Sequence, residues 1–240
     1  MSVKPIRSAM RALEALEAIA RHQPIGVGEL ARQLDEDKSG VQRALVTLAE
    51  SGWIRALADG PTRWELTPRI LAVASYAQAT AGLAQLIRPL MVSLRDQTQE
   101  TVICAVSDGD RVVITEVVES TQVVRSAPAV GFVVPTETSA SGRALLAAMD
   151  RSGRVRLAGH GLDAHAHAEL DKVRERGWSL NADDALEGST SVGAAVMSGS
   201  GLPVAAIAIS AVSSRMPPET QKQVGALLSE AVKELRVPDR

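Results

Sequence analysis

Apolar positions in the first fifty residues recur at the three- and four-residue spacing of amphipathic helices. Ser8 is a favourable N-cap for a first helix, which is predicted over residues 8–22. Leu30 and Leu34, four residues apart, predict a short second helix over residues 27–34. The apolar side of the first helix is formed by Leu13, Leu16, Ile19 and Ala20.

A third helix is predicted to follow Asp37, and its two sides differ in polarity. The apolar side carries Val41, Ala44, Leu45 and Leu48 at helical spacing. The opposite side carries Ser39, Gln42, Arg43, Val46 and Glu50. Gly52 suits the position just beyond the end of this helix. The helix therefore offers an apolar side for packing and a mainly polar side for solvent or a ligand.

Two β-like runs, over residues 53–57 and 63–66, complete the N-terminal region. The sequence Asp59-Gly60-Pro61-Thr62 between them is typical of a hairpin turn. Three helices and a hairpin within seventy residues are in the order of a winged helix-turn-helix, so we predict a DNA-binding domain over residues 1–69. An alanine-rich helical linker is predicted over residues 70–82.

The rest of the chain, residues 83–240, mixes hairpins with helices. The β-branched runs over 101–106 and 111–118 flank Asp108-Gly109-Asp110, which indicates a hairpin. Further strands are predicted over 123–126, 130–134, 189–197 and 203–212, and further helices over 83–99, 141–149, 164–176 and 218–235. This order predicts an α+β fold with a mainly antiparallel sheet, because alternating βαβ units are absent from the pattern.

Composition narrows the classes of function. Aromatic residues make up only 2% of the chain, which is too few for a platform that stacks single-stranded nucleic acid. A single cysteine, Cys104, excludes an internal disulfide and a multi-cysteine zinc site, and its place in a β run predicts a buried, apolar role. The apolar stretches are far shorter than the ~18 residues of a membrane span. Together with the lack of a signal-peptide pattern, this predicts a cytoplasmic protein.

The polar side of the third predicted helix suits the major groove of double-stranded DNA. Gln42 is able to bond adenine bidentately, and Arg43 is able to bond guanine in the same way. Val46, apolar on an outward side, suits contact with a thymine methyl group. The alternative is an ordinary amphipathic helix whose polar side is only solvated.

Phosphate contacts are predicted around the same helix. Lys38 and Ser39 lie in its first turn, and Arg63 lies in the hairpin that forms the wing. Gly40 is predicted to let the backbone approach DNA closely, since it has no side chain. The acidic run 35–37 argues in the opposite direction, because carboxylates that face DNA repel its phosphates.

Hydroxyl residues gather before and at the start of the helix predicted over 141–149. These are Thr136, Thr138, Ser139 and Ser141, and Ser189, Thr190, Ser191 and Ser210 add hydroxyls on later strands. Free backbone N–H groups at a helix start, together with hydroxyls, suit a small anion. The alternative is that these residues only cap the helix and solubilise the strands.

Signals for catalysis are sparse. His160, His165 and His167 fall within eight residues and are a candidate zinc site, with a solvated surface as the alternative. The sequence contains no Walker loop, no G-x-S-x-G elbow, no G-x-G-x-x-G after a strand and no H-E-x-x-H motif. We therefore predict no cofactor and no catalytic residues.

These motifs, taken in order, resemble the IclR family of bacterial transcriptional regulators over essentially the whole chain. Residues 38–48, Lys-Ser-Gly-Val-Gln-Arg-Ala-Leu-Val-Thr-Leu, resemble the recognition-helix pattern K-S-T-V-H-R-L-L-x-T-L. Segments 98–102, 138–146 and 188–196 are similar to the family's T-G-E-T-V, G-K-A-L-L and G-x-x-C/S-x-A-A-P-V segments. Gly40 and Gln42 replace Thr and His of the pattern, which predicts a different operator.

The resemblance implies that residues 83–240 form a GAF-like domain for effector binding and oligomerisation. Carried over position by position, it implies an effector site at Ala140, Ser141, Asn181, Ser191 and Ser210. Asn181 stands where the family often has an acid, and Ala195 where it has proline. The amide of Asn181 both donates and accepts hydrogen bonds, so the usual small-acid effector of the family is not assumed for this chain. We expect a small polar or carboxylated metabolite near the three serines, between aliphatic walls because aromatic residues are few.

The sequence thus predicts a regulator that binds a double-stranded DNA operator and whose operator affinity is modulated by a small-molecule effector. A homodimer or homotetramer is expected, because one helix contacts too few base pairs for genomic specificity. One alternative is a small-molecule or metal-dependent enzyme with a helical adaptor domain. Another is a protein–protein adaptor that uses the winged helix as a scaffold.

Overall fold

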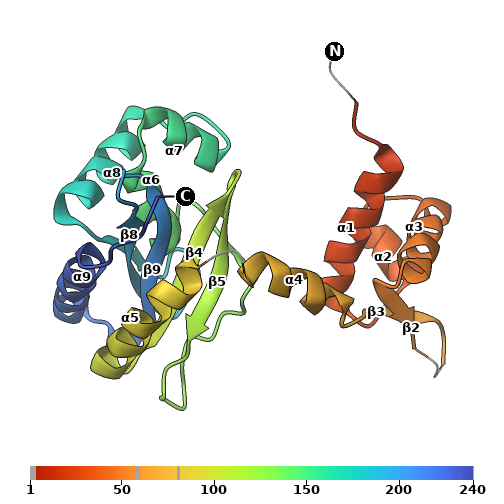
Figure 1. Ribbon diagram of the computed structural model, residues 1–240, viewed down its shortest axis with the longest axis horizontal. Helices are drawn as coiled ribbons and strands as arrows, with labels where there is room; N and C mark the ends of the chain where they lie inside the picture. Colours follow the sequence, from red (N-terminus) through yellow and green to blue (C-terminus); the bar gives the residue numbers. More distant parts are fainter. Residues whose placement is uncertain (1–3, 58–59, 80–81, 240) are drawn as a thin grey trace. The chain divides into compact units, whose positions relative to one another are not determined.

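The computed structural model describes residues 4–57, 60–79 and 82–239, and the chain divides into two units, Met1–Ala81 and Gly82–Arg240 (Figure 1). The first unit contains α1 (Arg7–His22), α2 (Val27–Gln33), α3 (Lys38–Glu50) and α4 (Arg69–Ala79). Its strands β1 (Ile25–Gly26), β2 (Ile54–Ala56) and β3 (Arg63–Leu66) form an antiparallel sheet of order β1-β3-β2. The predicted order of helices and hairpin is confirmed.

The core of the first unit joins the three predicted helices to the hairpin. Ile19 of α1, Leu30 of α2 and Leu45 of α3 have no exposed surface. Ile54 of β2 and Trp64 of β3 are buried in the same cluster. Each such side chain contributes about 1.5–3 kcal/mol relative to an exposed one, so the wing is fixed to the helices by apolar packing.

The first helix differs in two details from the prediction. It begins at Arg7, so the predicted N-cap role of Ser8 is wrong: Ser8 lies inside the first turn. Leu13 was predicted to face the core but is 61% exposed. The reason is that α1 packs through Ala15 and Ile19, which lie on a different side of the helix.

Strand β1 was not predicted, because two residues are too short to show alternation. It pairs with β3 through Ile25 opposite Trp64. Asp59 of the predicted turn, and Thr80 and Ala81 of the predicted linker, lie outside the described residues.

The second unit is a sheet covered by helices (Figure 1). Its strands are β4 (Thr101–Asp108), β5 (Arg111–Val118), β6 (Val133–Val134), β7 (Ser179–Ala182), β8 (Ser189–Met197) and β9 (Pro203–Val212). They are antiparallel to their neighbours in the order β6-β5-β4-β9-β8-β7. The helices are α5 (Leu83–Thr98), α6 (Ala140–Ala148), α7 (Arg151–Ala158), α8 (Ala164–Arg176) and α9 (Pro218–Lys233), with a short 3₁₀ helix at Ser213–Arg215.

Successive side chains of each strand point to opposite faces of the sheet, so this unit has one apolar cluster on each face. Cys104 and Ile207 point from one face of the sheet into a cluster with α5 and α9. Ala105 and Ala206 point from the other face into a cluster with α6, α7 and α8. Cys104 is 2% exposed, and burial raises the pKa of its thiol to about 11. The predicted α+β fold and the buried role of Cys104 are both confirmed.

Three predictions for this unit need correction. Residues 123–126 do not form a strand. Val123 is 93% exposed, so its β-branched side chain is not packed against a sheet. The strand predicted over 130–134 shrinks to β6, two residues long. Helix α7 and strand β7 were not predicted, because α7 is rich in arginine without an apolar stripe and β7 has only four residues.

Candidate DNA-binding and effector-binding sites

Helix α3 presents the predicted side chains to solvent. Gln42, Arg43 and Val46 are exposed, and so are Lys38 and Ser39 in the first turn. The helix packs into its own unit through the opposite side, where Val41, Leu45 and Leu48 are buried. This is the geometry that major-groove binding requires: an apolar side held by the domain and a free polar side.

Asp37 organises the start of α3. As the N-cap residue, it accepts a hydrogen bond from the backbone N–H of Gly40 at 2.7 Å. It also accepts one from the Ser39 hydroxyl at 2.5 Å, and Arg43 donates to Ser39 Oγ at 3.4 Å. The hydrogen bonds from Ser39 and Gly40, together with nearby Arg11 and Arg43, lower the pKa of Asp37 below its usual value. The carboxylate stays ionised and holds the first turn in place.

The surroundings of Gly40 indicate a packing role, in place of the predicted close approach of DNA to its backbone. It is buried, and a Cβ at this position would come within 2.4 Å of the guanidinium atom Nη1 of Arg11. Arg11 of α1 crosses this point to donate to Glu36 at 2.5 Å. The absence of a side chain at Gly40 therefore makes room for an ion pair of the unit itself, and an approach of DNA to this backbone is not supported.

Arg63 of β3 is also bound within its own unit. Its Nε and Nη2 atoms donate to the carbonyl of Pro24 at 3.0 and 2.7 Å, and Nη2 donates to Glu29 at 3.0 Å. A phosphate at Arg63 would compete with these bonds. These bonds fix the hairpin to the start of α2. They favour this structural role of Arg63, and not the predicted phosphate contact.

The predicted effector residues come together on one face of the C-terminal sheet. Asn181, Ser191 and Ser210 are directly opposite one another on β7, β8 and β9. Thr101 of β4 continues the same row beside Ser210. We call these four residues the polar row. Thr101 was not predicted, because only strand register links it to Ser210.

The polar row is buried and internally bonded. Asn181 donates to Ser191 Oγ at 3.5 Å and accepts from the backbone N–H groups of Asp184 and Ala185. Its four members are between 0% and 9% exposed. A ligand that contacts these side chains must therefore displace some of the segments that cover them.

Helix α6 begins beside the polar row. Ser139 caps it by accepting from Gly142 N–H at 3.1 Å, which is the capping role that the sequence offered as the alternative to an anion site. Ala140 lies against the β7–β8 pair, where its carbonyl accepts from the Ser179 hydroxyl at 2.6 Å. Ala140 and Ser141 are both buried in the first turn. The register places Ser179, opposite Gly193, two residue pairs beyond Asn181 and Ser191 and so on the same face of the sheet.

The three histidines of the candidate zinc site have different surroundings. His160 lies near Glu137, with Nε2 2.8 Å from its carboxylate, whereas His167 is buried and touches Arg154. His165 is exposed on α8. Within residues 4–57, 60–79 and 82–239, no three His, Cys, Asp or Glu side chains are grouped so as to hold a metal ion. The geometry gives the zinc interpretation no support.

Comparison with known families decides between regulator and enzyme. Residues 76–237 match the family described as bacterial transcriptional regulator IclR, C-terminal, and residues 8–58 match the IclR helix-turn-helix domain. The chain belongs to the IclR family of bacterial transcriptional regulators. The resemblance identified from the motifs is confirmed.

Individual relatives are similar to this chain over most of its length. The transcriptional repressor IclR of Escherichia coli is 27% identical over 96% of this chain and 89% of that protein. The probable transcriptional regulator SauR of Cupriavidus necator is 31% identical over 87% of each. The structure of an IclR-type transcriptional regulator from Alicyclobacillus acidocaldarius superposes with a TM-score of 0.80 at 21% identity, over 97% of this chain and 98% of that one.

The IclR-family protein is thus a DNA-binding transcriptional regulator with a C-terminal effector-binding domain. The alternative of an enzyme with a helical adaptor is wrong, because the family and its relatives are regulators. In the described part of the chain, every helix is too short or too polar to cross a lipid bilayer.

Proposed function

We propose that α3 contacts operator base edges through Gln42, Arg43 and Val46, and operator phosphates through Lys38 and Ser39. The observation that carries this proposal is the exposure of all five side chains on the side of α3 that does not pack. A bidentate arginine–guanine contact is worth about 1–3 kcal/mol of discrimination. Contact with phosphates adds affinity that falls as salt rises.

The test is quantitative binding to an operator selected from random duplex DNA with the purified protein. Arg43→Ala is expected to weaken specific binding by about 1–3 kcal/mol. Lys38→Ala is expected to weaken binding to all sequences alike and to reduce the salt slope by about one. Arg236→Ala, an exposed arginine of the second unit, is the charge-matched control. Unchanged operator affinity in Arg43→Ala would show that Arg43 does not contact a base edge.

We propose that the protein binds DNA as a homodimer or a larger homo-oligomer. In the first unit, the N-cap residue Ile6 and residues Met10 and Leu13 of α1 are 70%, 47% and 61% exposed, at helical spacing. Leu71 and Val73 of α4 are 69% and 49% exposed. Apolar surface of this kind marks an interaction site.

Sedimentation of the full chain over a range of concentrations tests this interface. Leu13→Asp is expected to shift the protein towards monomer and to weaken operator binding. Ser8→Asp, which adds the same charge on another exposed side of α1, is expected to sediment like the wild type. A Leu13→Asp variant that stays as associated as the wild type would place the interface elsewhere.

We propose that the effector is a small polar or carboxylated metabolite held by the start of α6 and the polar row. The buried hydroxyls of Ser141, Ser191 and Ser210 and the amide of Asn181 support such a ligand, because they offer both donors and acceptors in a water-poor site. Binding alters operator affinity only if the ligand prefers one of two protein states.

A panel of small mono- and dicarboxylates, screened for release of the protein from its operator, tests the site. Once an active compound is found, Ser141→Leu is expected to abolish release while operator binding is retained. Ser200→Ala, an exposed serine in the β8–β9 turn, serves as the control. Release of Ser141→Leu at the wild-type ligand concentration would contradict the assignment.

A further inference from the structure

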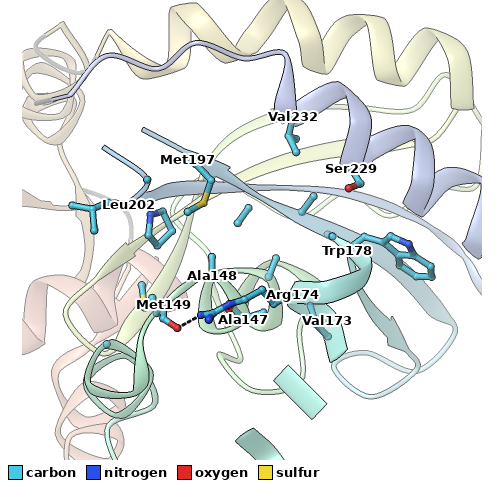
Figure 2. A pocket seen from close by; sticks show the side chains of 18 of the residues that line it. Ala147, Ala148, Met149, Val173, Arg174, Trp178, Met197, Leu202, Ser229 and Val232 are labelled. Atoms are coloured by element: carbon cyan, nitrogen blue, oxygen red, sulfur yellow. Dashed lines mark hydrogen bonds between the residues drawn. The ribbon is translucent and has the colours of Figure 1, made fainter. Parts of the chain in front are cut away.

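A groove of about 850 Å³ lies at the end of α6 opposite to the polar row (Figure 2). Its floor and walls come from Ala147 and Ala148 of α6, Met149, Trp178, Met197 of β8 and Val232 of α9. A smaller hollow of about 450 Å³ shares Met197 and Val232 and extends it towards the C-terminus. The volume is in the range of about 300–1,000 Å³ that small-molecule sites occupy.

The groove exists because β7 is shorter than β8. Strand β7 pairs with β8 only as far as Gly193, so within residues 82–239 no strand lies beside Ala195 and Met197 on that edge. Ala195 is half-buried and Met197 exposed at the place where a longer β7 would cover them. The edge is left as an apolar trough between α6 and α9.

The walls favour an aliphatic ligand over an aromatic one. Trp178 is the one aromatic side chain among the residues that line the groove. The guanidinium of Arg176 lies over its ring, 4.3 Å from the centroid. Gly225 of α9 packs so closely on the indole that a Cβ there would be 2.3 Å from ring carbon Cδ2. An incoming ring therefore finds no free face on which to stack, whereas an alkyl chain fits the alanine, valine and methionine walls.

Charge around the groove favours an anionic head group. Arg156, Arg174 and Lys233 line it, against a single acid, Asp150. Asp150 is already committed to capping α7, where its carboxylate accepts from Gly153 N–H at 2.7 Å. Arg174 is held at the groove by its hydrogen bonds to the carbonyls of Ala147 and Met149 (Figure 2). These two bonds use Nε and Nη2 of Arg174, and both acceptors are neutral carbonyls, so the charge and the Nη1 donors can serve a carboxylate. Arg63 differs, because its Nη2 atom already pairs with the carboxylate of Glu29.

We propose that this groove binds a medium-chain alkyl carboxylate, with the chain along the free edge of β8 and the carboxylate at Arg174. The ligand would be a second small molecule, separate from the effector at the polar row. The proposal therefore does not depend on the effector assignment or on DNA binding.

Calorimetric titration of the full chain with decanoate, kept below its micelle concentration, tests the ligand class. Decanoate is expected to bind about fifteenfold more tightly than octanoate, since each buried methylene is worth about 0.8 kcal/mol. Acetate, which has the head group without the chain, is expected not to bind. Decyltrimethylammonium, which has the same chain and the opposite charge, is expected to bind at least tenfold more weakly. Absence of decanoate binding, or equal binding of the two decyl compounds, overturns the proposal.

Three variants locate the site. Ala148→Phe fills the groove from a half-buried position and is expected to abolish decanoate binding. Arg174→Gln is expected to weaken decanoate at least tenfold and to preserve the decanoate-to-octanoate ratio. Ser191→Ala, at the polar row, is expected to bind decanoate like the wild type. Protection of Cys104 from thiol reagents checks that each variant is folded.

These variants distinguish a ligand in the groove from a ligand bound elsewhere on the protein. Wild-type decanoate binding in Ala148→Phe, or loss of binding in Ser191→Ala, places the ligand outside the groove and overturns the proposal. A change in oligomeric mass of Ala148→Phe without any decanoate binding by the wild type assigns the groove to a second copy of the chain, and it also overturns the proposal.

Discussion

Gly142 is the position where the structure allows the least change near the predicted effector site. A Cβ added there would lie 2.0 Å from the backbone carbonyl oxygen of Thr136 and 2.7 Å from its carbonyl carbon. Gly142 is in the first turns of α6, directly after Ser141. The close approach holds the segment before α6 against the helix and so shapes the turn that leads to the polar row.

The size of the effect of Gly142→Ala follows from this contact. The carbonyl of Thr136 must retreat from 2.0 Å to at least 3.0 Å, and it belongs to the backbone rather than to a flexible side chain. Overpacking of this kind costs about 3 kcal/mol at the upper end of its usual range. Alanine recovers about 1 kcal/mol of helix propensity relative to glycine. The net loss of stability of the second unit is therefore about 2 kcal/mol.

Cys104 provides an assay that reports on this unit alone. It is the only cysteine of the chain and is 2% exposed, so a thiol reagent reaches it when the second unit opens. A loss of about 2 kcal/mol predicts labelling about 25-fold faster in dilute urea. With a urea m-value of about 2 kcal/mol/M, the unfolding midpoint falls by about 1 M.

Gly161→Ala is the matched control for this prediction. Gly161 belongs to the same unit and has no atom within 4 Å of an added Cβ, so its variant is expected to label at the wild-type rate. Equal rates for Gly142→Ala and Gly161→Ala would refute the reasoning, because the close approach to Thr136 would then have no energetic consequence.

Two further predictions concern buried and titrating groups. Arg154 is 2% exposed and donates to the carbonyls at the end of α6, so Arg154→Met leaves these acceptors without their donor and is expected to destabilise the second unit by about 1–3 kcal/mol in the Cys104 assay. Asp171→Asn leaves the buried guanidinium of Arg154 without its carboxylate partner, so it is also expected to accelerate the labelling of Cys104. Labelling of Asp171→Asn at the wild-type rate would contradict this expectation. Hydrogen bonds to Gly161 O and Glu137 raise the pKa of His160 above 6.5, so His160 stabilises the fold below pH 6.5 and this contribution is lost as pH rises through the raised value. NMR titration is expected to show a lower pKa for His160 in Glu137→Gln; an unchanged pKa would rule out the contribution from Glu137.

The features that were predicted correctly depend on patterns among residues that are close together in the sequence. The buried and exposed sides of α3 follow directly from helical periodicity, which five or six neighbouring residues already express. The start of α3 after Asp37 and the burial of Cys104 in a strand also depend on near neighbours only. These features do not need the rest of the chain to be known.

Contacts between distant segments account for the features that were not predicted. Gly40 is covered by Arg11, which comes from another helix, and Arg63 donates to the carbonyl of Pro24, which directly precedes β1. Thr101 joins the polar row only because β4 pairs with β9 in one particular register. Neither hydrophobic period nor turn composition encodes these pairings, so a single sequence did not reveal them.

The most direct test of the account is a change of base preference caused by Gln42. Selection of operators from random duplex DNA is performed with the wild type and with Gln42→Arg, under the same salt conditions. If Gln42 contacts a base edge, the preferred base at one position of each half-site changes from adenine to guanine, while the other positions are retained. The same preferred sequence for both proteins, with only a uniform change in affinity, would contradict the claim that this side of α3 lies in the major groove.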